Sequence, residues 1–181
     1  MPPWERIMKI KESSFKALRF LAVCLLVMYL MFGHQYQVTY NYGESMIPTF
    51  SNGEWIYSQK RSHLPKEWTP SQLDIIVVTK EGEDLVKRVV ALEGDVVYIK
   101  HGKIYVNDKI YKDQFSEKHI TFWTEDEEIR NKKPENEWLF LNVYQDIGRV
   151  PEGHVWVIGD NRSLSWYGMV KIKNIKSLVI F

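Results

Sequence analysis

The feature that most limits how this chain can fold is an uncharged apolar run, FLAVCLLVMYLMFG, from Phe20 to Gly33. With Ala17, Leu18 and a snorkelling Arg19 it extends to a span of 17 residues. A helix of that length covers roughly 25 Å, at about 1.5 Å per residue, against a hydrocarbon core about 30 Å thick. We therefore expect one short transmembrane helix over residues 17–34.

The charge around this run favours an anchor that stays in the protein. Residues 1–19 carry five basic and two acidic side chains, a net +3, while the rest of the chain carries 19 basic and 21 acidic ones. Because basic flanks stay on the cytoplasmic side, we expect residues 1–16 in the cytoplasm and residues 35–181 outside the cell membrane. A cleaved signal peptide has a similar start, but the following HQYQVTYNY lacks a small-residue cleavage pattern. A retained single-pass signal-anchor is preferred over a cleaved signal or a buried helix of a soluble domain.

Composition excludes several other functions. The net charge is only +1, and no Lys/Arg run is interleaved with aromatic residues, so we expect no nucleic-acid partner. Cys24 is the single cysteine, which rules out a disulfide framework or a cysteine-based metal site within one chain. The five histidines have no metal-ligand spacing such as HExxH. We expect neither a metal nor another cofactor.

Beyond residue 35 the chain has the pattern of a mostly β domain. Short runs rich in β-branched and aromatic residues are bounded by Gly, Pro, Asn or Asp. The runs are residues 37–42, 54–58, 74–79, 85–92, 95–100, 103–108, 154–159 and 177–181. His101-Gly102 separates two of them, and a two-residue turn with Gly second predicts a hairpin. From about 109 to 149 the pattern decays into charged segments such as WTEDEEIRNKKPENEW, which predicts an inserted lobe.

One hydroxyl in this β region stands at a turn that suits a nucleophile. Ser45 lies in YGESMIPTF, between an acid and a methionine and just before a proline. No histidine is close in sequence, so a histidine-based triad would require long-range assembly. A neutral lysine amine is the other established base for serine. Because lysine titrates near 10.4, its pKa would have to fall by about 2 to 3 units to serve near neutral pH.

Lys87 is the lysine whose surroundings suit that demand. It lies in the apolar strand LVKRVVAL, where alternation places Leu85, Lys87 and Val89 on one face and Val86 and Arg88 on the other. One of the two basic side chains must therefore point toward hydrophobic neighbours. From the local pattern alone, an edge strand with both faces partly solvated is the preferred interpretation, and Lys87 as a base is the less favoured one.

Three ordered segments resemble the bacterial type I signal peptidases. GESMIPTF resembles the nucleophile box of that family, LVKRVVALEGD the lysine box, and VIGDNR the box near the end of the chain. Their order and spacing and the preceding apolar run agree with the family over most of the chain, except residues 109–149. The resemblance implies a signal-peptidase-like β catalytic core and a membrane-bound serine endopeptidase. Its substrates would be signal-peptide-bearing preproteins, cut after small residues.

The same resemblance implies roles for individual side chains. Ser45 corresponds to the nucleophile and Lys87 to the general base of a Ser/Lys dyad, with the Ser45 backbone N–H as an oxyanion donor. Gly43 offers no hydroxyl as a second donor, which is similar to Gram-positive members. Met46 is expected to pack beneath the turn and shield the lysine. Supporting roles fall to Ser165, whose hydroxyl would help to hold the lysine, and to Asp160, which would pair with Arg88.

One segment departs from the family pattern. The family commonly continues G-D-N-R-x-x-S-x-D-S-R, with the Asp and Arg as a supporting ion pair, whereas this chain continues GDNRSLSWYGMV. A gapless alignment places Tyr167 and Met169 at those two positions, whereas a short deletion would match Trp166-Tyr167-Gly168 to the aromatic-glycine step that follows them in the family. In both alignments the acid and the arginine are absent. Trp166 and Tyr167 would then either fill the space or form an aromatic rim at lipid headgroups.

Two other functions stay open, the first of them because of this departure. One is a catalytically weakened relative that acts as an assembly factor for secreted surface proteins. The other is a cytoplasmic Ser/Lys self-cleaving regulator, which the apolar run and the lack of a DNA-reading module oppose. The sequence therefore favours the membrane-bound peptidase.

Overall fold

The computed structural model describes residues 3–116 and 144–180. The chain divides into two compact units, Met1–Tyr36 and Gln37–Phe181, which are considered separately below.

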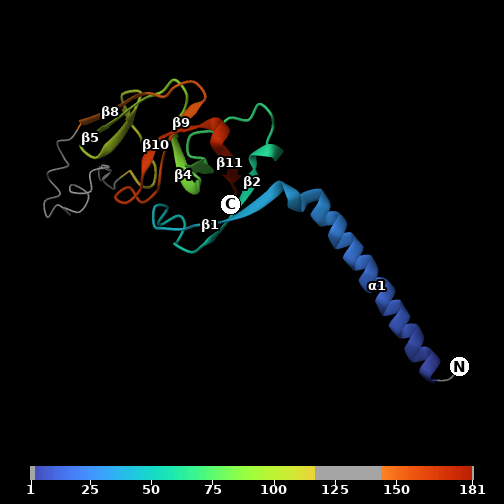
Figure 1. The fold of residues 1–181 in the computed structure, drawn as a ribbon. Helices are drawn as coiled ribbons and strands as arrows, with labels where there is room; N and C mark the ends of the chain where they lie inside the picture. The colour runs from blue at the N-terminus through green and yellow to red at the C-terminus, as the bar shows by residue number, and fades with distance from the viewer. Residues whose placement is uncertain (1–2, 117–143, 181) are drawn as a thin grey trace. The chain divides into compact units, whose positions relative to one another are not determined.

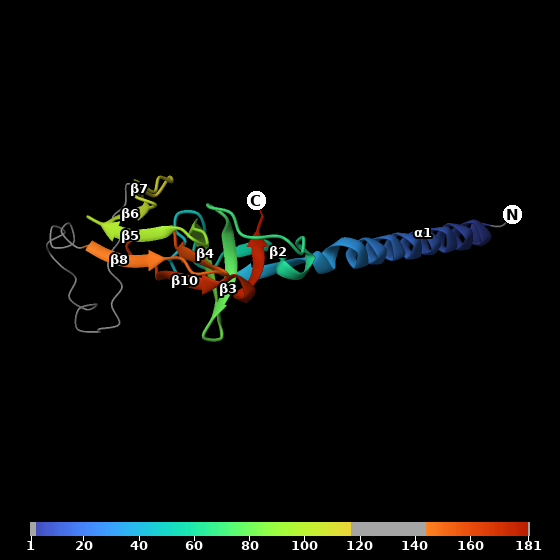
Figure 2. The ribbon, with the colours of Figure 1, turned by 90° about the horizontal axis from the view of Figure 1, so that it is seen from above.

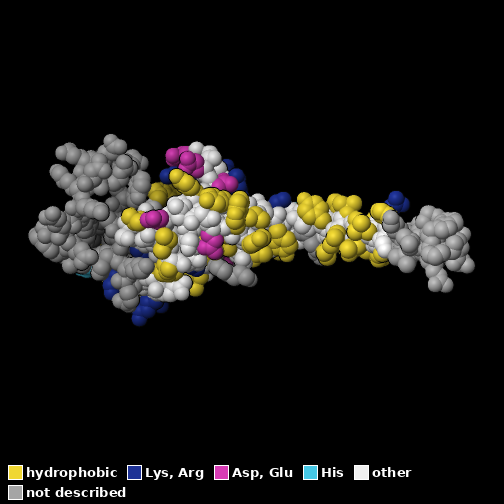
Figure 3. All heavy atoms as spheres, turned by 90° about the horizontal axis from the view of Figure 1, so that it is seen from below, with side chains coloured by type: hydrophobic (Ala, Val, Ile, Leu, Met, Phe, Trp, Pro, Cys, Tyr) yellow, Lys and Arg dark blue, Asp and Glu magenta, His cyan; other side chains and the backbone are white. Residues whose placement is uncertain are grey.

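The N-terminal unit is one long helix, α1 (Pro3–Phe32), followed by a 3-10 turn, η1 (Gly33–Gln35). Within it, Ser14–Gln35 forms a stretch of 22 residues with a mean hydropathy of 2.0, long and apolar enough to cross a membrane. At about 1.5 Å per residue this stretch covers roughly 33 Å, which is longer than the roughly 25 Å expected for the 17-residue span. Figure 3 shows hydrophobic side chains along its described part. Leu18, Phe20 and Tyr29 are among the exposed ones.

The second unit is built on a seven-stranded sheet with the order β1-β2-β11-β3-β4-β9-β10. Neighbouring strands from β2 to β10 in this order pair antiparallel. In chain order its strands are β1 (Tyr36–Tyr40), β2 (Trp55–Lys60), β3 (Ile75–Lys80), β4 (Glu83–Ala91), β9 (His154–Ile158), β10 (Tyr167–Lys171) and β11 (Ile175–Val179). Two short 3-10 turns, η2 (Arg61–His63) and η4 (Ile172–Asn174), connect strands of this sheet.

A smaller sheet is inserted between β4 and β9, which are neighbours in the large sheet. Its order is β7-β6-β5-β8, from β5 (Val96–Lys100), β6 (Lys103–Val106), β7 (Lys109–Ile110) and β8 (Tyr144–Arg149). Figures 1 and 2 show it at one end of the unit, with β2 and β11 at the other. The inserted region expected over about 109–149 includes β7 and β8, and its residues 117–143 lie outside the described residues.

Buried side chains join the two sheets. One cluster takes Val97, Ile99 and Ile104 from the small sheet, and Trp156 and Tyr167 from the large one. Two further clusters lie on the large sheet, and Val86 belongs to one of them while Leu85 and Val89 belong to the other. This division follows the alternation that the sequence of β4 predicts.

The mostly β prediction is confirmed, and the differences have local causes. The His101-Gly102 hairpin is present, with both residues at positive φ and Lys100 paired to Lys103. Strand β10 was not expected, because Gly168 and Met169 interrupt its β-branched pattern. The edge-strand alternative for LVKRVVAL is wrong, since β4 lies between β3 and β9 and is buried from Val86 to Ala91.

Candidate active site

Ser45 lies in the loop that joins β1 to β2. Gly43 opens the loop at φ +95°, a conformation that glycine adopts without strain, and donates its N–H to Asn52 Oδ1 at 2.9 Å. Next to Ser45, Met46 is completely buried in a cluster with Phe50 and Ile56. Burial of the neighbouring side chain anchors the loop on the sheet and fixes where the hydroxyl can lie.

Lys87 reaches Ser45 from the middle of β4, opposite Ile76 on β3. Its Nζ lies 2.7 Å from Ser45 Oγ, and the residue is only 3% exposed. When the amine is protonated it donates to Oγ, and when it is neutral it can accept the Ser45 proton instead. The two side chains are therefore within direct proton-transfer distance.

The surroundings of Lys87 make its ammonium group easier to deprotonate. Burial lowers the pKa of Lys87 from its ordinary 10.5 to about 8, against the opposing effect of the Asp160 carboxylate. With a pKa of about 8, roughly a tenth of the amines are neutral at pH 7 and half at pH 8. This supply of neutral amine allows Lys87 to act as a base near physiological pH.

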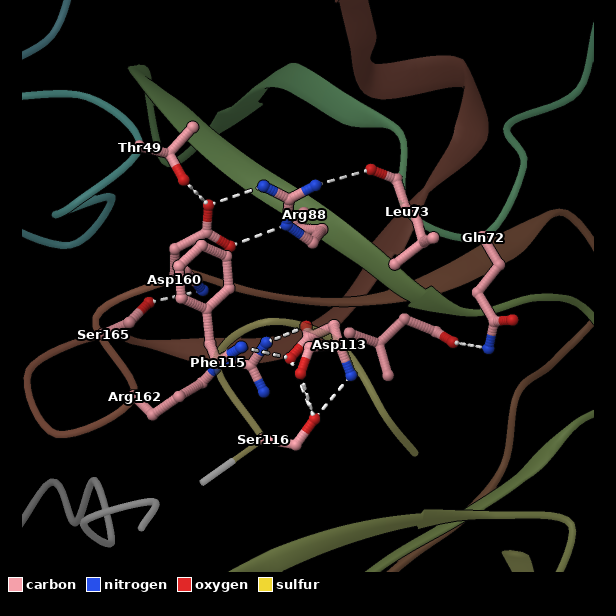
Figure 4. Close-up of polar contacts among 12 residues, drawn as sticks. Thr49, Gln72, Leu73, Arg88, Asp113, Phe115, Ser116, Asp160, Arg162 and Ser165 are labelled. Atoms are coloured by element: carbon pink, nitrogen blue, oxygen red, sulfur yellow. Dashed lines mark hydrogen bonds and ion pairs between the residues drawn. The ribbon is translucent and has the colours of Figure 1, made fainter. Parts of the chain in front are cut away.

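The neighbouring basic residue has the opposite surroundings. Arg88 donates from Nε and Nη2 to the two carboxylate oxygens of Asp160, each at 2.7 Å, and from Nη1 to Leu73 O at 2.9 Å. Thr49, from the Ser45 loop, donates its hydroxyl proton to the same carboxylate. Figure 4 shows this network, which ties β4 to the nucleophile loop and to the segment after β9.

The segment after β9 contacts the backbone of Ser45 directly. Asn161 donates its N–H to Ser45 O at 3.0 Å and its Nδ2 proton to Glu44 O at 3.1 Å. A Cβ added at Gly159 would lie 2.1 Å from Ser45 O and 2.3 Å from Ser165 Oγ. Only glycine allows these two segments to approach so closely.

A second buried ion pair holds the same segment from its other side. Arg162 donates from Nη2 to Asp113, which follows β7, and their side chains are 2% and 4% exposed. The Phe115 ring lies between the two guanidinium groups, 5.5 Å from that of Arg88 and 5.7 Å from that of Arg162. The small sheet therefore contributes charged contacts to the surroundings of the site.

The structure brings most of the sequence-predicted residues together. Ser45 and Lys87 are hydrogen-bonded, Met46 is buried beside Ser45, and Arg88 pairs with Asp160 as expected.

Ser165 makes different hydrogen bonds from the one expected. Its Oγ accepts the Gly159 N–H and donates to Trp166 O, each at 2.7 Å, and neither bond involves the Lys87 amine. The hydroxyl stabilises the turn after β9 instead.

Tyr167 and Met169, which stand where the family has its Asp and Arg, lie in largely apolar surroundings. Tyr167 is 9% exposed and packs against Trp156, while Met169 packs on the same cluster. Trp166 is half-buried, with the Lys80 amine 4.2 Å above its ring. Tyr167 therefore fills space in the core and forms no rim at the surface.

Four contributors to the site were not singled out from the sequence. Thr49 and Asn161 stand inside the boxes that resemble the family, so their positions carried a signal that was not used. Gly159 directly precedes Asp160, which the sequence did predict. A glycine is required at position 159 because the distant Ser45 loop approaches it, and the local sequence does not reveal that approach. Asp113 is separated from Arg162 by 49 positions and has no local pattern that would identify it.

Comparison with known proteins identifies a family with this arrangement. Residues 14–180 match the family model described as signal peptidase, peptidase S26. Signal peptidase I of Bacillus caldolyticus is 33% identical over 179 residues, which covers 90% of this chain and 86% of that protein. Signal peptidase I V of Bacillus subtilis (strain 168) is 31% identical over 144 residues, covering 76% and 79%.

A solved structure is also similar. The crystal structure of a signal peptidase I from Enterococcus faecalis V583 covers 63% of this chain and 98% of its own, with 22% identity and a TM-score of 0.44. The family model, which spans nearly the whole chain, carries the assignment. The chain belongs to the S26 family of signal peptidases.

Proposed function

We propose that Ser45 is the nucleophile and Lys87 the general base with which this chain hydrolyses preproteins. As a member of the signal peptidase family, the chain is a serine endopeptidase that removes signal peptides. The observation that carries the residue assignment is the 2.7 Å separation of Ser45 Oγ from Lys87 Nζ, combined with the burial that lowers the pKa of that amine. An intact contact of this kind favours the peptidase over a catalytically weakened assembly factor.

In the acylation step, the neutral Lys87 amine takes the Ser45 proton as Oγ attacks the carbonyl carbon of the scissile bond. The resulting Lys87 ammonium then gives its proton to the leaving amine, the C–N bond breaks, and an ester on Ser45 remains. In deacylation, Lys87 takes a proton from water as the water oxygen attacks the ester carbon; the bond from that carbon to Ser45 Oγ then breaks, and Lys87 returns the proton to Oγ, which restores the hydroxyl and the neutral amine. We assign the Ser45 backbone N–H as one donor to the oxyanion, a role worth about 3 to 4 kcal/mol for a single donor.

The membrane arrangement is part of the proposal. The apolar stretch Ser14–Gln35 would anchor the chain with its basic N-terminus in the cytoplasm and residues 37–181 outside, beside substrates that are tethered by their own signal sequences. Exposed aromatic side chains at Tyr40, Tyr42, Trp55 and Tyr57 would suit contact with lipid headgroups.

Preprotein cleavage by single variants tests the dyad. We expect Ser45→Ala and Lys87→Ala each to remove measurable cleavage of a signal-peptide-bearing precursor in detergent, followed by gel and mass spectrometry. With the unmodified protein, mass spectrometry of the products should show that the precursor is cut after a small residue. Matched controls are Ser62→Ala and Lys176→Ala, which change exposed side chains and should keep full activity. Circular dichroism must show that both dyad variants keep the β fold, and wild-type-like cleavage by Lys87→Ala would refute the assigned base.

A further inference from the structure

The loop that follows β9 is held between two partners. On one side Asn161 contacts both carbonyls that flank the Ser45 N–H, those of Glu44 and Ser45. On the other side, the next residue, Arg162, is paired with Asp113 of the small-sheet segment. Figure 4 shows the Asp113 side of this arrangement, with Phe115 and Ser116 around the carboxylate.

The contact with Glu44 has a geometric consequence for the oxyanion donor. The Glu44 carbonyl and the Ser45 N–H belong to one planar peptide unit and point in opposite directions from it. Glu44 O accepts protons from Ile47 N–H at 3.2 Å and from Asn161 Nδ2 at 3.1 Å. These two bonds fix the plane of the peptide, and with it the direction in which the Ser45 N–H points.

The position of Asn161 depends in turn on the rest of its loop. Its own carbonyl accepts the N–H groups of Leu164 and Ser165, at 3.1 and 2.9 Å, which makes Asn161–Ser165 a compact turn. Arg162 lies inside that turn and is 2% exposed. A guanidinium at such depth requires a charged partner, because an unpaired buried charge is strongly destabilising.

Asp113 is built to be that partner. Besides binding Arg162, its carboxylate accepts the Phe115 N–H at 2.9 Å, and the Ser116 hydroxyl donates to the Asp113 carbonyl at 2.6 Å. These bonds hold the carboxylate in one orientation, and Phe115 closes the space between Arg162 and Arg88. The small sheet therefore presents a fixed acceptor to the loop.

We propose that Asp113 is a positioning residue for the reaction: by holding Arg162 it keeps Asn161 on the Glu44–Ser45 peptide, and so orients the Ser45 N–H toward the oxyanion. The proposal rests on the roles proposed above for Ser45 and Lys87. Asp113 touches neither side chain and acts only through the loop. A displacement of the loop by about 1 Å is enough to reduce catalysis by roughly a hundredfold.

A double-mutant cycle on the full-length protein in detergent tests this chain of contacts. We expect Asp113→Asn and Asn161→Ala each to lower kcat for precursor cleavage by roughly ten- to a hundredfold, with a smaller change in KM. If Asp113 acts through Asn161, the double variant loses little more than the more impaired single variant. Asp113→Glu, which keeps the charge, should recover most of the loss. Asp84→Asn breaks an ion pair with Lys176 elsewhere on the surface and is the matched control that should keep full activity.

The outcomes separate this proposal from its alternatives. Wild-type kcat in folded Asp113→Asn, or losses that multiply in the double variant, would overturn it. If Asp113→Asn proves too unstable to assay, Arg162→Lys, which weakens the same ion pair, takes its place in the cycle with Asn161→Ala, with thermal unfolding measured alongside. Retained cleavage by Ser45→Ala would refute the proposed function itself. An inactive Ser45→Ala together with a fully active Asp113→Asn would refute only the role of Asp113.

Discussion

Lys87 and Arg88 are consecutive buried residues on β4, yet Arg88 binds a charged partner and Lys87 a neutral one. Arg88 forms two 2.7 Å hydrogen bonds with the Asp160 carboxylate, whereas Lys87 lies 2.7 Å from the neutral hydroxyl of Ser45. A carboxylate stabilises the cation that it binds, while a hydroxyl in a dry environment does so much less. Arg88 is therefore a permanent cation that stabilises the structure, and Lys87 is an amine that can lose its proton.

The pH dependence of cleavage should follow the titration of this amine. Because only neutral Lys87 can accept the Ser45 proton, kcat/KM should rise with pH through about 8 and level off above it. Activity at pH 6 should be roughly a hundredfold below the plateau. Initial rates on a soluble signal-peptide substrate from pH 5.5 to 9.5 measure the profile. A rate that is flat from pH 6 to 9 would contradict a titrating base at this position.

Replacing Asp160 should move that profile. The Asp160 carboxylate raises the pKa of Lys87 against the effect of burial, so Asp160→Asn should shift the rise in kcat/KM to below pH 8. Breaking the buried pair with Arg88 should also destabilise the protein by about 3 to 5 kcal/mol. Activity is therefore compared at a temperature where circular dichroism shows a folded variant. A shift toward higher pH would show that Asp160 does not act on the amine through its charge.

Some of this arrangement was accessible from the sequence and some was not. The apolar residues around Lys87 made it only a candidate for a buried base, and the boxes that resemble signal peptidases decided in its favour and predicted Ser45 as its partner. Both features are local, so spacing and periodicity record them. The contact between Asp113 and Arg162 joins the segment after β7 to the segment after β9 across 49 positions, and neither residue has neighbours that reveal it. Ser165 shows a different limit of the sequence. Its place in the box predicted that its hydroxyl helps to hold Lys87, but the hydroxyl binds the backbone of the turn after β9.

The free energy of unfolding should also depend on pH because the Lys87 amine is buried. In wild type the folded pKa of Lys87 is about 8 and the unfolded one 10.5, so between these values the unfolded chain binds more protons and stability rises with pH. Lys87→Met has no such titration. Its stability advantage over wild type should therefore be largest below pH 8 and should shrink by about 3 kcal/mol up to pH 10.5. Chemical denaturation of both proteins at pH 7 and pH 10.5 measures the difference, and a constant difference would argue against a buried titrating lysine.

Gly159 should tolerate no side chain. A Cβ there would meet the Ser45 carbonyl oxygen at 2.1 Å and Ser165 Oγ at 2.3 Å, and the first of these belongs to the backbone of the nucleophile. We expect Gly159→Ala to lower kcat by roughly a hundredfold and to destabilise the fold by about 1 to 3 kcal/mol. Adding Ser165→Ala removes only the second contact, so the double variant should stay impaired. Recovery of full activity in that double variant would place the critical contact at Ser165 instead.

The part of the chain beyond α1 should retain chemistry without the helix. Residues 37–181 form a compact unit of their own, and it contains Ser45, Lys87 and both buried ion pairs. We expect residues 35–181 to cleave a soluble signal-peptide substrate with kcat close to that of the full chain. Cleavage of a precursor embedded in lipid vesicles should fall much further, because the two reactants are no longer confined to one membrane. Assays of both substrates with both proteins measure the two effects. A truncated protein that is folded but inactive toward the soluble peptide would show that α1 contributes more than tethering.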